Sequence, residues 1–340
     1  MVTDQWRNCY DVAVVGGGAA GLSGALMLAR ARRSVVVFDA GAPRNAPAAG
    51  VHGLLALDGV APAELLERGR AEVRGYGGHV VNGEVTAVAR DSDRFTVTTA
   101  DGRSVRARRL LVTTGLVDEL PDVQGLRERW GRDVLHCPYC HGWEVRDQAI
   151  GVLASGPLAV HQALLFRQWS AEVILFTGTM PPLTGAEAEQ VAARGIRVVD
   201  GAVASLETVD DRLVGVRLSN GTVVARSVLV VQSRMVARAS FLAPLGLRPT
   251  EHPSGAGEHI PADTTGRTEV PGIWVAGNVT EPATQVGGAA AAGAAAAAQI
   301  NADLVVEETR QAVAAHRDPF AREMEAQVCE RVMGDRRHGL

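Results

Sequence analysis

Alternating blocks of apolar and polar residues divide the chain into short strands and helices. The first apolar block, residues 11–15, leads into a glycine-rich turn and a helix-like stretch over residues 22–32, and a second block at 34–38 follows. Continuous runs of Val, Ile and Leu of this length are typical of strands buried on both faces of a parallel sheet. The order strand, turn, helix, strand therefore predicts the start of a doubly wound α/β sheet.

The same patterns predict two modules of this kind, one inserted into the other. The first module continues with a helix at 62–75 and strands at 86–89, 94–99 and 108–113. The second begins at 149–153, turns at 154–156, and continues with a helix to about residue 170 and strands at 172–176, 196–199, 204–210, 212–218 and 227–231. The chain then returns to the first module with a strand at 272–278 and a helix at 285–308. We therefore expect two Rossmann-like domains, a discontinuous one at 1–117 and 246–340 and an inserted one at 118–245.

Composition excludes several functional classes. The net charge of -4 gives no broad basic field and aromatic residues are only 4%, so we expect no nucleic-acid partner. The start lacks a basic segment followed by an apolar core, and no stretch reaches about 18 uninterrupted apolar residues. The alanine-rich run at 287–298 indicates a helix packed closely on a sheet. We therefore expect a cytoplasmic protein without a membrane segment.

The glycines after the first strand have the spacing of a dinucleotide-binding turn. Gly16, Gly18 and Gly21 allow the backbone to turn tightly and approach a pyrophosphate at a helix N-terminus. Asp39 follows at the end of the second strand, where a carboxylate can accept hydrogen bonds from ribose hydroxyls. The alternative is a glycine-rich turn of purely structural use, but the strand before it, the helix after it and the acid together favour a dinucleotide.

The segment His136-Cys137-Pro138-Tyr139-Cys140-His141 is the main candidate for chemistry. Cys9 and Cys329, near the two ends, have no local partner. Three functions fit the Cys-x-x-Cys pair: attachment of a c-type haem, a zinc site with the flanking histidines, or a redox-active disulfide. A haem site requires export and zinc usually requires a second ligand pair, so we expect a redox disulfide and no metal.

His141 is a candidate acid–base group, because a histidine with a pKa of about 6.5 exchanges protons near neutral pH. His136 is a second candidate.

Later segments carry a family resemblance. The strand ending at Val275-Ala276-Gly277-Asn278, with a helix opening near Gln285, resembles the second FAD motif of the pyridine nucleotide-disulfide oxidoreductases. Thr113-Thr114-Gly115 resembles their crossover out of the FAD domain, and the Cys-x-x-Cys pair has the position found in low-molecular-weight thioredoxin reductases. The resemblance implies FAD and a homodimer. It implies that Cys140 lies against the flavin and Cys137 exchanges with the thiol substrate, with His141 replacing the usual aspartate. The cofactor contacts that we expect are Gly16, Gly18, Ala19, Ala20, Gly21, Asp39, Ala40, Arg44, Asn45, His52, Val85, Thr114, Gly115, Gly277, Asn278, Gln285 and Val286.

The second module departs from a reductase. Its turn begins with Ala154 where a first glycine is expected, and Thr177 to Met180 stand where reductases have a His-Arg-Arg group for the NADPH 2′-phosphate. We therefore expect NADPH to bind poorly or not at all. The chain most resembles the dithiol oxidases of holomycin and gliotoxin biosynthesis. This implies that a small-molecule dithiol is oxidised to its disulfide and that O2 becomes H2O2. The alternatives are a disulfide reductase fed by NADPH, NADH or ferredoxin, and a flavin-binding redox sensor.

Overall fold

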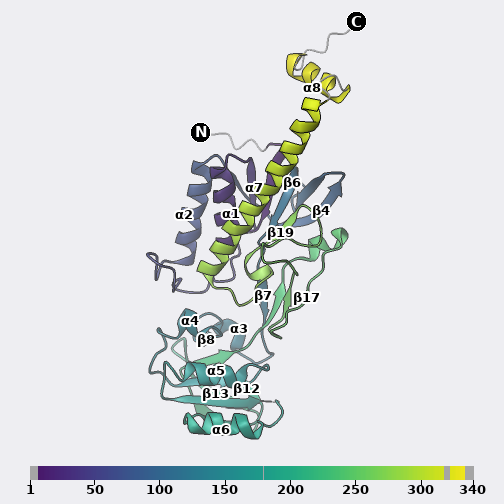
Figure 1. Ribbon diagram of the computed structural model, residues 1–340. Coiled ribbons are helices and arrows are strands. Elements are labelled where there is room, and N and C mark those ends of the chain that lie inside the picture. Colours follow the sequence, from purple (N-terminus) through teal and green to yellow (C-terminus); the bar gives the residue numbers. More distant parts are fainter. Residues whose placement is uncertain (1–6, 179, 318–321, 334–340) are drawn as a thin grey trace.

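A computed structural model describes residues 7–178, 180–317 and 322–333, and it contains two α/β modules joined by a narrow ribbon (Figure 1). The first module has a seven-stranded sheet in the order β3-β2-β1-β6-β5-β4, with β19 also paired to β6. Its strands are β1 (Cys9–Val15), β2 (Val35–Asp39), β3 (His79–Asn82), β4 (Val85–Asp91), β5 (Arg94–Thr99), β6 (Ser104–Val112) and β19 (Ile273–Val275). β3, β2, β1, β6 and β19 are parallel, and β5 and β4 form an antiparallel hairpin beside β6.

Side chains along β1 alternate between two buried faces of this sheet. Val12 and Val14 pack under helices α1 (Ala19–Arg30), α2 (Pro62–Gly75) and α7 (Val286–Arg317), whereas Ala13 and Val15 face a second cluster. This alternation follows from the two-residue period of a strand. The apolar run at residues 11–15 is continuous because both faces are covered, as the sequence predicted.

The second module has a five-stranded parallel sheet in the order β11-β10-β9-β15-β8. Its strands are β8 (Val134–Leu135), β9 (Ile150–Leu153), β10 (Val173–Gly178), β11 (Arg197–Asp200) and β15 (Val228–Val231), and its helices are α3 (Leu126–Arg129), α4 (Pro138–His141), α5 (Ala159–Phe166) and α6 (Gly185–Ala193). An antiparallel sheet of β12 (Val203–Val209), β13 (Arg212–Leu218) and β14 (Val223–Ala225) accompanies it. Both parallel sheets therefore agree with the predicted pair of Rossmann-like units.

The two modules are connected by a ribbon that the sequence did not reveal. The chain leaves the first module through β7 (Leu116–Glu119) and returns through the antiparallel β16 (Arg234–Ala237). The return path continues through η1 (Ser240–Leu245), β17 (Thr250–Glu251) and β18 (Glu258–His259). β19 then rejoins the first sheet beside β6, so the first module is discontinuous, and η2 (Gly277–Val279) follows β19. The domain boundaries at 117/118 and 245/246 stay a prediction.

Helix α7 continues beyond residue 308, and α8 (Arg322–Met333) follows it. By length and composition α7 is also the one helix among the described residues that could cross a membrane. Its first half packs closely on α1, because a Cβ at Gly293 would overlap the backbone of Ala20. Only glycine allows so close an approach at this position. We therefore interpret the small apolar residues of α7 as core packing.

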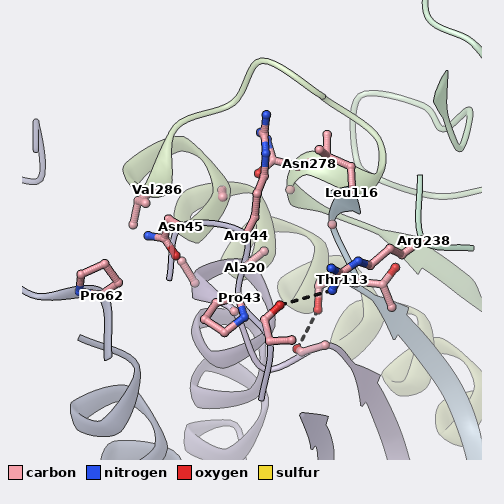
Figure 2. Close-up of a pocket in the computed structure, with 18 of the residues that line it drawn as sticks. Ala20, Pro43, Arg44, Asn45, Pro62, Thr113, Leu116, Arg238, Asn278 and Val286 are labelled. Atoms are coloured by element: carbon pink, nitrogen blue, oxygen red, sulfur yellow. Dashed lines mark hydrogen bonds between the residues drawn. The ribbon is translucent and has the colours of Figure 1, made fainter. Parts of the chain in front are cut away.

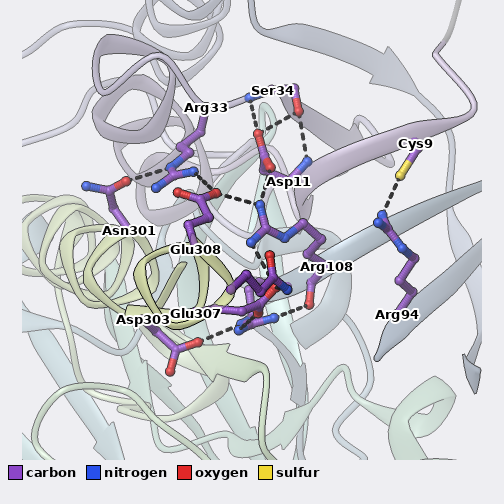
Figure 3. Close-up of polar contacts among 12 residues, drawn as sticks. Cys9, Asp11, Arg33, Ser34, Arg94, Arg108, Asn301, Asp303, Glu307 and Glu308 are labelled. Atoms are coloured by element: carbon purple, nitrogen blue, oxygen red, sulfur yellow. Dashed lines mark hydrogen bonds and ion pairs between the residues drawn. The ribbon is translucent and has the colours of Figure 1, made fainter. Parts of the chain in front are cut away.

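The second half of α7 is attached to the sheet by ion pairs (Figure 3). Arg108 Nη2 lies 2.9 Å from Glu307 Oε1, Arg109 Nε lies 2.7 Å from Asp303 Oδ2, and Arg33 Nη1 lies 2.6 Å from Glu308. These arginine side chains are largely buried. The pairs fix the register of the helix whose other end reaches the cavity described next.

Candidate active site

The glycine-rich turn lies between β1 and α1 and is held by a neighbouring strand. Thr113 Oγ1 donates hydrogen bonds to the carbonyl oxygens of Gly16 (2.9 Å) and Val15 (3.1 Å). Gly16 has a φ of 113°, which favours glycine. A Cβ at Gly21 would overlap the Gly16 carbonyl oxygen, so this third glycine allows the helix to pack on the turn.

A cavity of about 750 Å³ extends from this turn, where Ala20 and Thr113 lie (Figure 2), to the Cys-x-x-Cys segment. All the predicted cofactor contacts except Gly21 line it, and Gly21 packs on Gly16; that these residues contact the cofactor stays a prediction. The predicted catalytic residues also line it: His136, Cys137, Cys140 and His141. The sequence missed further lining residues that belong to no motif, among them Asp118, Trp130, Arg238 and Phe241. Strands β7 and β16 bring Asp118 and Arg238 to the cavity, and no local pattern signals this.

The walls of the cavity fit a dinucleotide. A Cβ at Gly18 would meet nothing within 4 Å, although this residue lines the cavity, so the space above it is open to a ligand. The Thr114 hydroxyl is buried and has no hydrogen-bond partner among the described residues. An orphaned buried hydroxyl is costly, and a bound polar group would satisfy it. Asp39, at the end of β2, accepts hydrogen bonds from Arg70 (2.8 Å) and from the Gly41 N–H (2.9 Å).

Asn278 organises the wall opposite the glycine turn. Its Nδ2 lies 2.9 Å from the carbonyl oxygen of Pro282, 2.8 Å from that of Thr284 and 3.3 Å from that of Glu281. A carboxylate could not donate to carbonyl oxygens, which explains why an amide suits this position. The Asn278 Nδ2 group therefore holds the loop before α7. The side-chain oxygen of Asn278 remains to hydrogen-bond a ligand, as the sequence predicted for this residue.

Cys137 and Cys140 form a disulfide, with Cα atoms 5.3 Å apart. Cys137 precedes α4 and Cys140 lies within it, and both line the cavity. Cys9 and Cys329 are exposed free thiols, and Arg94 Nη1 lies 2.8 Å from Cys9 Sγ. The redox pair therefore belongs to the inserted module but faces a cavity built mainly by the first module.

His141 follows Cys140 and has no polar partner of its own. Both of its ring nitrogens are buried without a hydrogen-bond partner among the described residues. Burial lowers the pKa of His141, and nearby His52 lowers it further, whereas the Glu144 carboxylate raises it. The ring is therefore neutral at neutral pH and free to accept a proton. His52 bridges the modules, with Nε2 3.4 Å from Glu144 and Nδ1 3.4 Å from Asp58.

His136 is held quite differently. Its Nε2 lies 3.4 Å from Arg44 Nη2, and its ring stacks on Trp130 with centroids 5.6 Å apart. Burial, together with the Arg44 charge, lowers the pKa of His136 to about 4. Arg44 in turn makes two 2.7 Å hydrogen bonds to Asp118. His136 is therefore uncharged at neutral pH and has a fixed partner.

The turn before α5, where a second dinucleotide would bind, carries the side chain of Gln232. Gln232 Oε1 accepts a hydrogen bond from the Leu158 N–H (3.2 Å), and Ser155 Oγ donates to the Gln232 carbonyl oxygen (2.9 Å). A Cβ at Gly156 would lie only 2.5 Å from Gln232 Oε1. The side chain of Gln232 therefore occupies the space at this turn.

Comparisons with known proteins agree with this geometry. A family model for the pyridine nucleotide-disulphide oxidoreductases matches residues 10–321. The thioredoxin reductase tcpT of Claviceps purpurea is 34% identical over 258 residues, which cover 71% of this chain and 78% of that relative. The thioredoxin reductase sirT of Leptosphaeria maculans is 31% identical over 312 residues, which cover 86% and 94%.

Two solved structures are also similar. The crystal structure of HlmI has a TM-score of 0.86 and 48% identity, and the match covers 92% of this chain and 98% of HlmI. An oxidoreductase from Agrobacterium tumefaciens has a TM-score of 0.82 and 36% identity, with 87% and 99% covered. The chain therefore belongs to the pyridine nucleotide-disulphide oxidoreductase family, as a thioredoxin-reductase-like enzyme that binds FAD.

Proposed function

We propose that this enzyme is a dithiol oxidase, which closes an intramolecular disulfide in a small-molecule dithiol and uses O2 as the acceptor. The observation that carries the proposal is the turn before α5, where the Gln232 side chain occupies part of the space that a second nucleotide would need. The inserted module is then a degenerate NADPH-type domain. Without that input, reducing equivalents enter through the cysteine pair.

The surroundings of this turn also disfavour a phosphate. The two cavities beside it, of about 490 and 600 Å³, are lined by one cationic side chain, Arg234, and by the carboxylates of Glu119, Asp122 and Glu187. Thr177 Oγ1, at the end of β10, donates to Asp200 (2.9 Å), so an acid lies where reductases hold a 2′-phosphate with arginines. Carboxylates at this position repel an anion.

The chemistry of the residues follows from their positions. A substrate thiol loses its proton to neutral His141, and the thiolate attacks Cys137 Sγ, which breaks the Cys137–Cys140 bond and leaves Cys140 as a thiolate. The second substrate thiol then attacks the substrate sulfur of this mixed disulfide. The substrate disulfide leaves, Cys137 is released, and the pair holds the two electrons. FAD, when bound, would supply the acceptor for these two electrons and the chemistry that transfers them to O2, which becomes H2O2.

We further propose, from the resemblance to oxidases of holomycin and gliotoxin biosynthesis, that the substrate is a natural-product dithiol and that the protein acts as a cytoplasmic homodimer. The similarity to HlmI supports a small-molecule dithiol. The similarity to relatives that are named thioredoxin reductases supports a second candidate function, that of a disulfide reductase.

Anaerobic mixing separates the two candidates. The oxidised flavoprotein is mixed with excess NADPH and, separately, with a small dithiol, and the visible flavin absorbance is followed. We expect bleaching by the dithiol and not by NADPH, with H2O2 formed when air is admitted. Cys137→Ser serves as the control, because it removes the sulfur that the dithiol attacks. Rapid bleaching by NADPH would refute the oxidase and return the protein to the reductases.

A further inference from the structure

A buried polar network connects the FAD-binding module to the residue that precedes Cys137. Arg44 lies in the loop after β2, Asp118 in β7, Ser233 directly before β16, and His136 directly before Cys137. Arg44 Nε and Nη2 donate to the two oxygens of Asp118, both at 2.7 Å, and Ser233 Oγ donates to Asp118 Oδ1 at 2.6 Å. The network therefore joins both strands of the connecting ribbon, the cavity wall and the redox segment.

Burial makes this network difficult to rearrange. The Asp118 side chain is 6% exposed and that of Arg44 is 22% exposed, and Ser233 is fully buried. Burial raises the pKa of Asp118, but the hydrogen bonds and the charge of Arg44 lower it by more, so the carboxylate stays ionised. A buried bidentate pair of this kind holds one geometry, because either partner left alone is an unpaired buried charge.

His136 connects this pair to the disulfide. A guanidinium can only donate, so the His136 Nε2 that faces Arg44 is an acceptor and carries no proton. The ring also stacks on Trp130, and the His136 carbonyl oxygen accepts a hydrogen bond from Gln162 Nε2 (3.3 Å). The residue before Cys137 is thus held from three sides, through its ring nitrogen, its ring face and its backbone.

We propose that Arg44 and Asp118 are positioning residues that act through the His136 imidazole to hold the Cys137–Cys140 pair against the FAD cavity. His136 is then an anchor and not an acid–base group. The inference deepens the proposed function and rests on it for the direction of electron flow.

Two substitutions at His136 separate an anchor from an acid–base group. His136→Gln keeps an acceptor for Arg44 but cannot exchange a proton, whereas His136→Phe keeps the ring face and loses the acceptor. Asp118→Asn weakens the other end of the network. Asp303→Asn is the matched control, because Asp303 is also a carboxylate paired with arginine (Arg109 at 2.7 Å and Arg267 at 2.6 Å) but does not line the cavity.

Three properties of each flavoprotein are measured: the rate of anaerobic flavin bleaching by dithiothreitol, the rate of alkylation of the reduced cysteines by iodoacetamide, and the rate of flavin reoxidation in air. We expect His136→Phe and Asp118→Asn to bleach about 10- to 100-fold more slowly, since a misplacement of about 1 Å has costs of this size. Their cysteines should be alkylated faster, because the segment is released. His136→Gln should bleach faster than His136→Phe, because it keeps an acceptor for Arg44, and Asp303→Asn should stay within about twofold of the parent.

The outcomes are distinct. A His136→Gln enzyme that is as slow as His136→Phe would overturn the anchor in favour of acid–base chemistry. Parental bleaching and alkylation rates in both His136→Phe and Asp118→Asn would overturn positioning altogether. Slow reoxidation of the parent in air would refute the proposed oxidase while leaving the anaerobic comparison, and hence the network, intact.

Discussion

Acidification should destabilise this protein through His136 at a pH where most carboxylates are still ionised. The folded-state pKa of His136 is about 4, because of burial and the Arg44 charge, whereas an unfolded histidine has a pKa of about 6.5. Between these values the unfolded chain binds a proton that the folded chain does not. Stability is therefore complete above about pH 6.5 and is lost as the pH falls toward 4.

The magnitude follows from the two pKa values. Between pH 7.5 and pH 5, one histidine with this shift lowers the free energy of unfolding by up to about 2 kcal/mol. The unfolding entropy is about 2.1 cal/mol/K per residue, which for 340 residues amounts to about 0.7 kcal/mol/K. The expected shift in the melting temperature is therefore about 3 °C.

The assay compares thermal unfolding of the parent and His136→Gln in matched buffers between about pH 5 and pH 7.5. The glutamine keeps an acceptor for Arg44 but does not titrate, so the difference between the two proteins isolates His136 from other groups. His141, whose pKa burial also lowers, contributes equally to both and cancels. We expect the melting-temperature difference to change by about 3 °C, with the parent losing more stability in acid.

A difference that is independent of pH would refute this reasoning, because it would mean that His136 takes up protons as readily in the folded chain as in the unfolded one. A parent that gains stability in acid relative to His136→Gln would refute it more strongly. That result would require the Asp118 carboxylate to outweigh both burial and Arg44 at the imidazole.

Three further predictions concern the cavity. Cys137→Ser and Cys140→Ser should retain FAD but lose bleaching by dithiols, and a flavin-to-protein ratio below that of the parent would contradict a purely chemical role. His141→Ala should bleach about 100-fold more slowly at neutral pH. Burial lowers the pKa of His141, so the neutral, basic form of its ring is lost only as the pH falls through that lowered value. The bleaching rate of the parent should therefore decrease in acid, and that of His141→Ala should not. Identical pH profiles for the two proteins would exclude His141 as the base. Gly18→Ala should weaken FAD retention and change the stability of the apoprotein little, because a Cβ there meets no protein atom. Gly21→Ala should lower the stability of the apoprotein by about 1–3 kcal/mol. Equal effects of the two substitutions on apoprotein melting would contradict the packing role of Gly21.

The sequence predicted well those features that depend on neighbouring residues. The glycine turn, the strands around it and the Cys-x-x-Cys pair were placed correctly, because their geometry requires particular residue types at short spacing. Gly21 was assigned to the cofactor because its position in the motif is the same whether it contacts a ligand or packs on Gly16. Residues beyond 308 are helical because alanines and charged residues continue the helix without an internal stop signal.

Features that depend on distant residues could not be predicted. Arg44 and Asp118 are separated by 74 positions, and Ser233 lies 115 positions beyond Asp118. No spacing rule connects them, and the ribbon that brings them together is too short to be recognised from its pattern. The substitution at Ala154 pointed to a lost nucleotide site, but the side chain that fills the turn is Gln232, 77 positions after Ser155.

The position of the second turn bears on the proposed direction of electron flow. The two cavities beside it share no lining residue with the FAD cavity, whereas Cys137 and Cys140 line the FAD cavity directly. In this arrangement a nucleotide at the second turn would not face the flavin. Electron transfer from such a nucleotide to the flavin would require the inserted module to rotate relative to the first module. This rotation would break the contacts from Arg44 to His136 and from His52 to Glu144. A reductase would have to break and remake these contacts in every cycle, whereas a dithiol oxidase can complete its cycle with both of them intact.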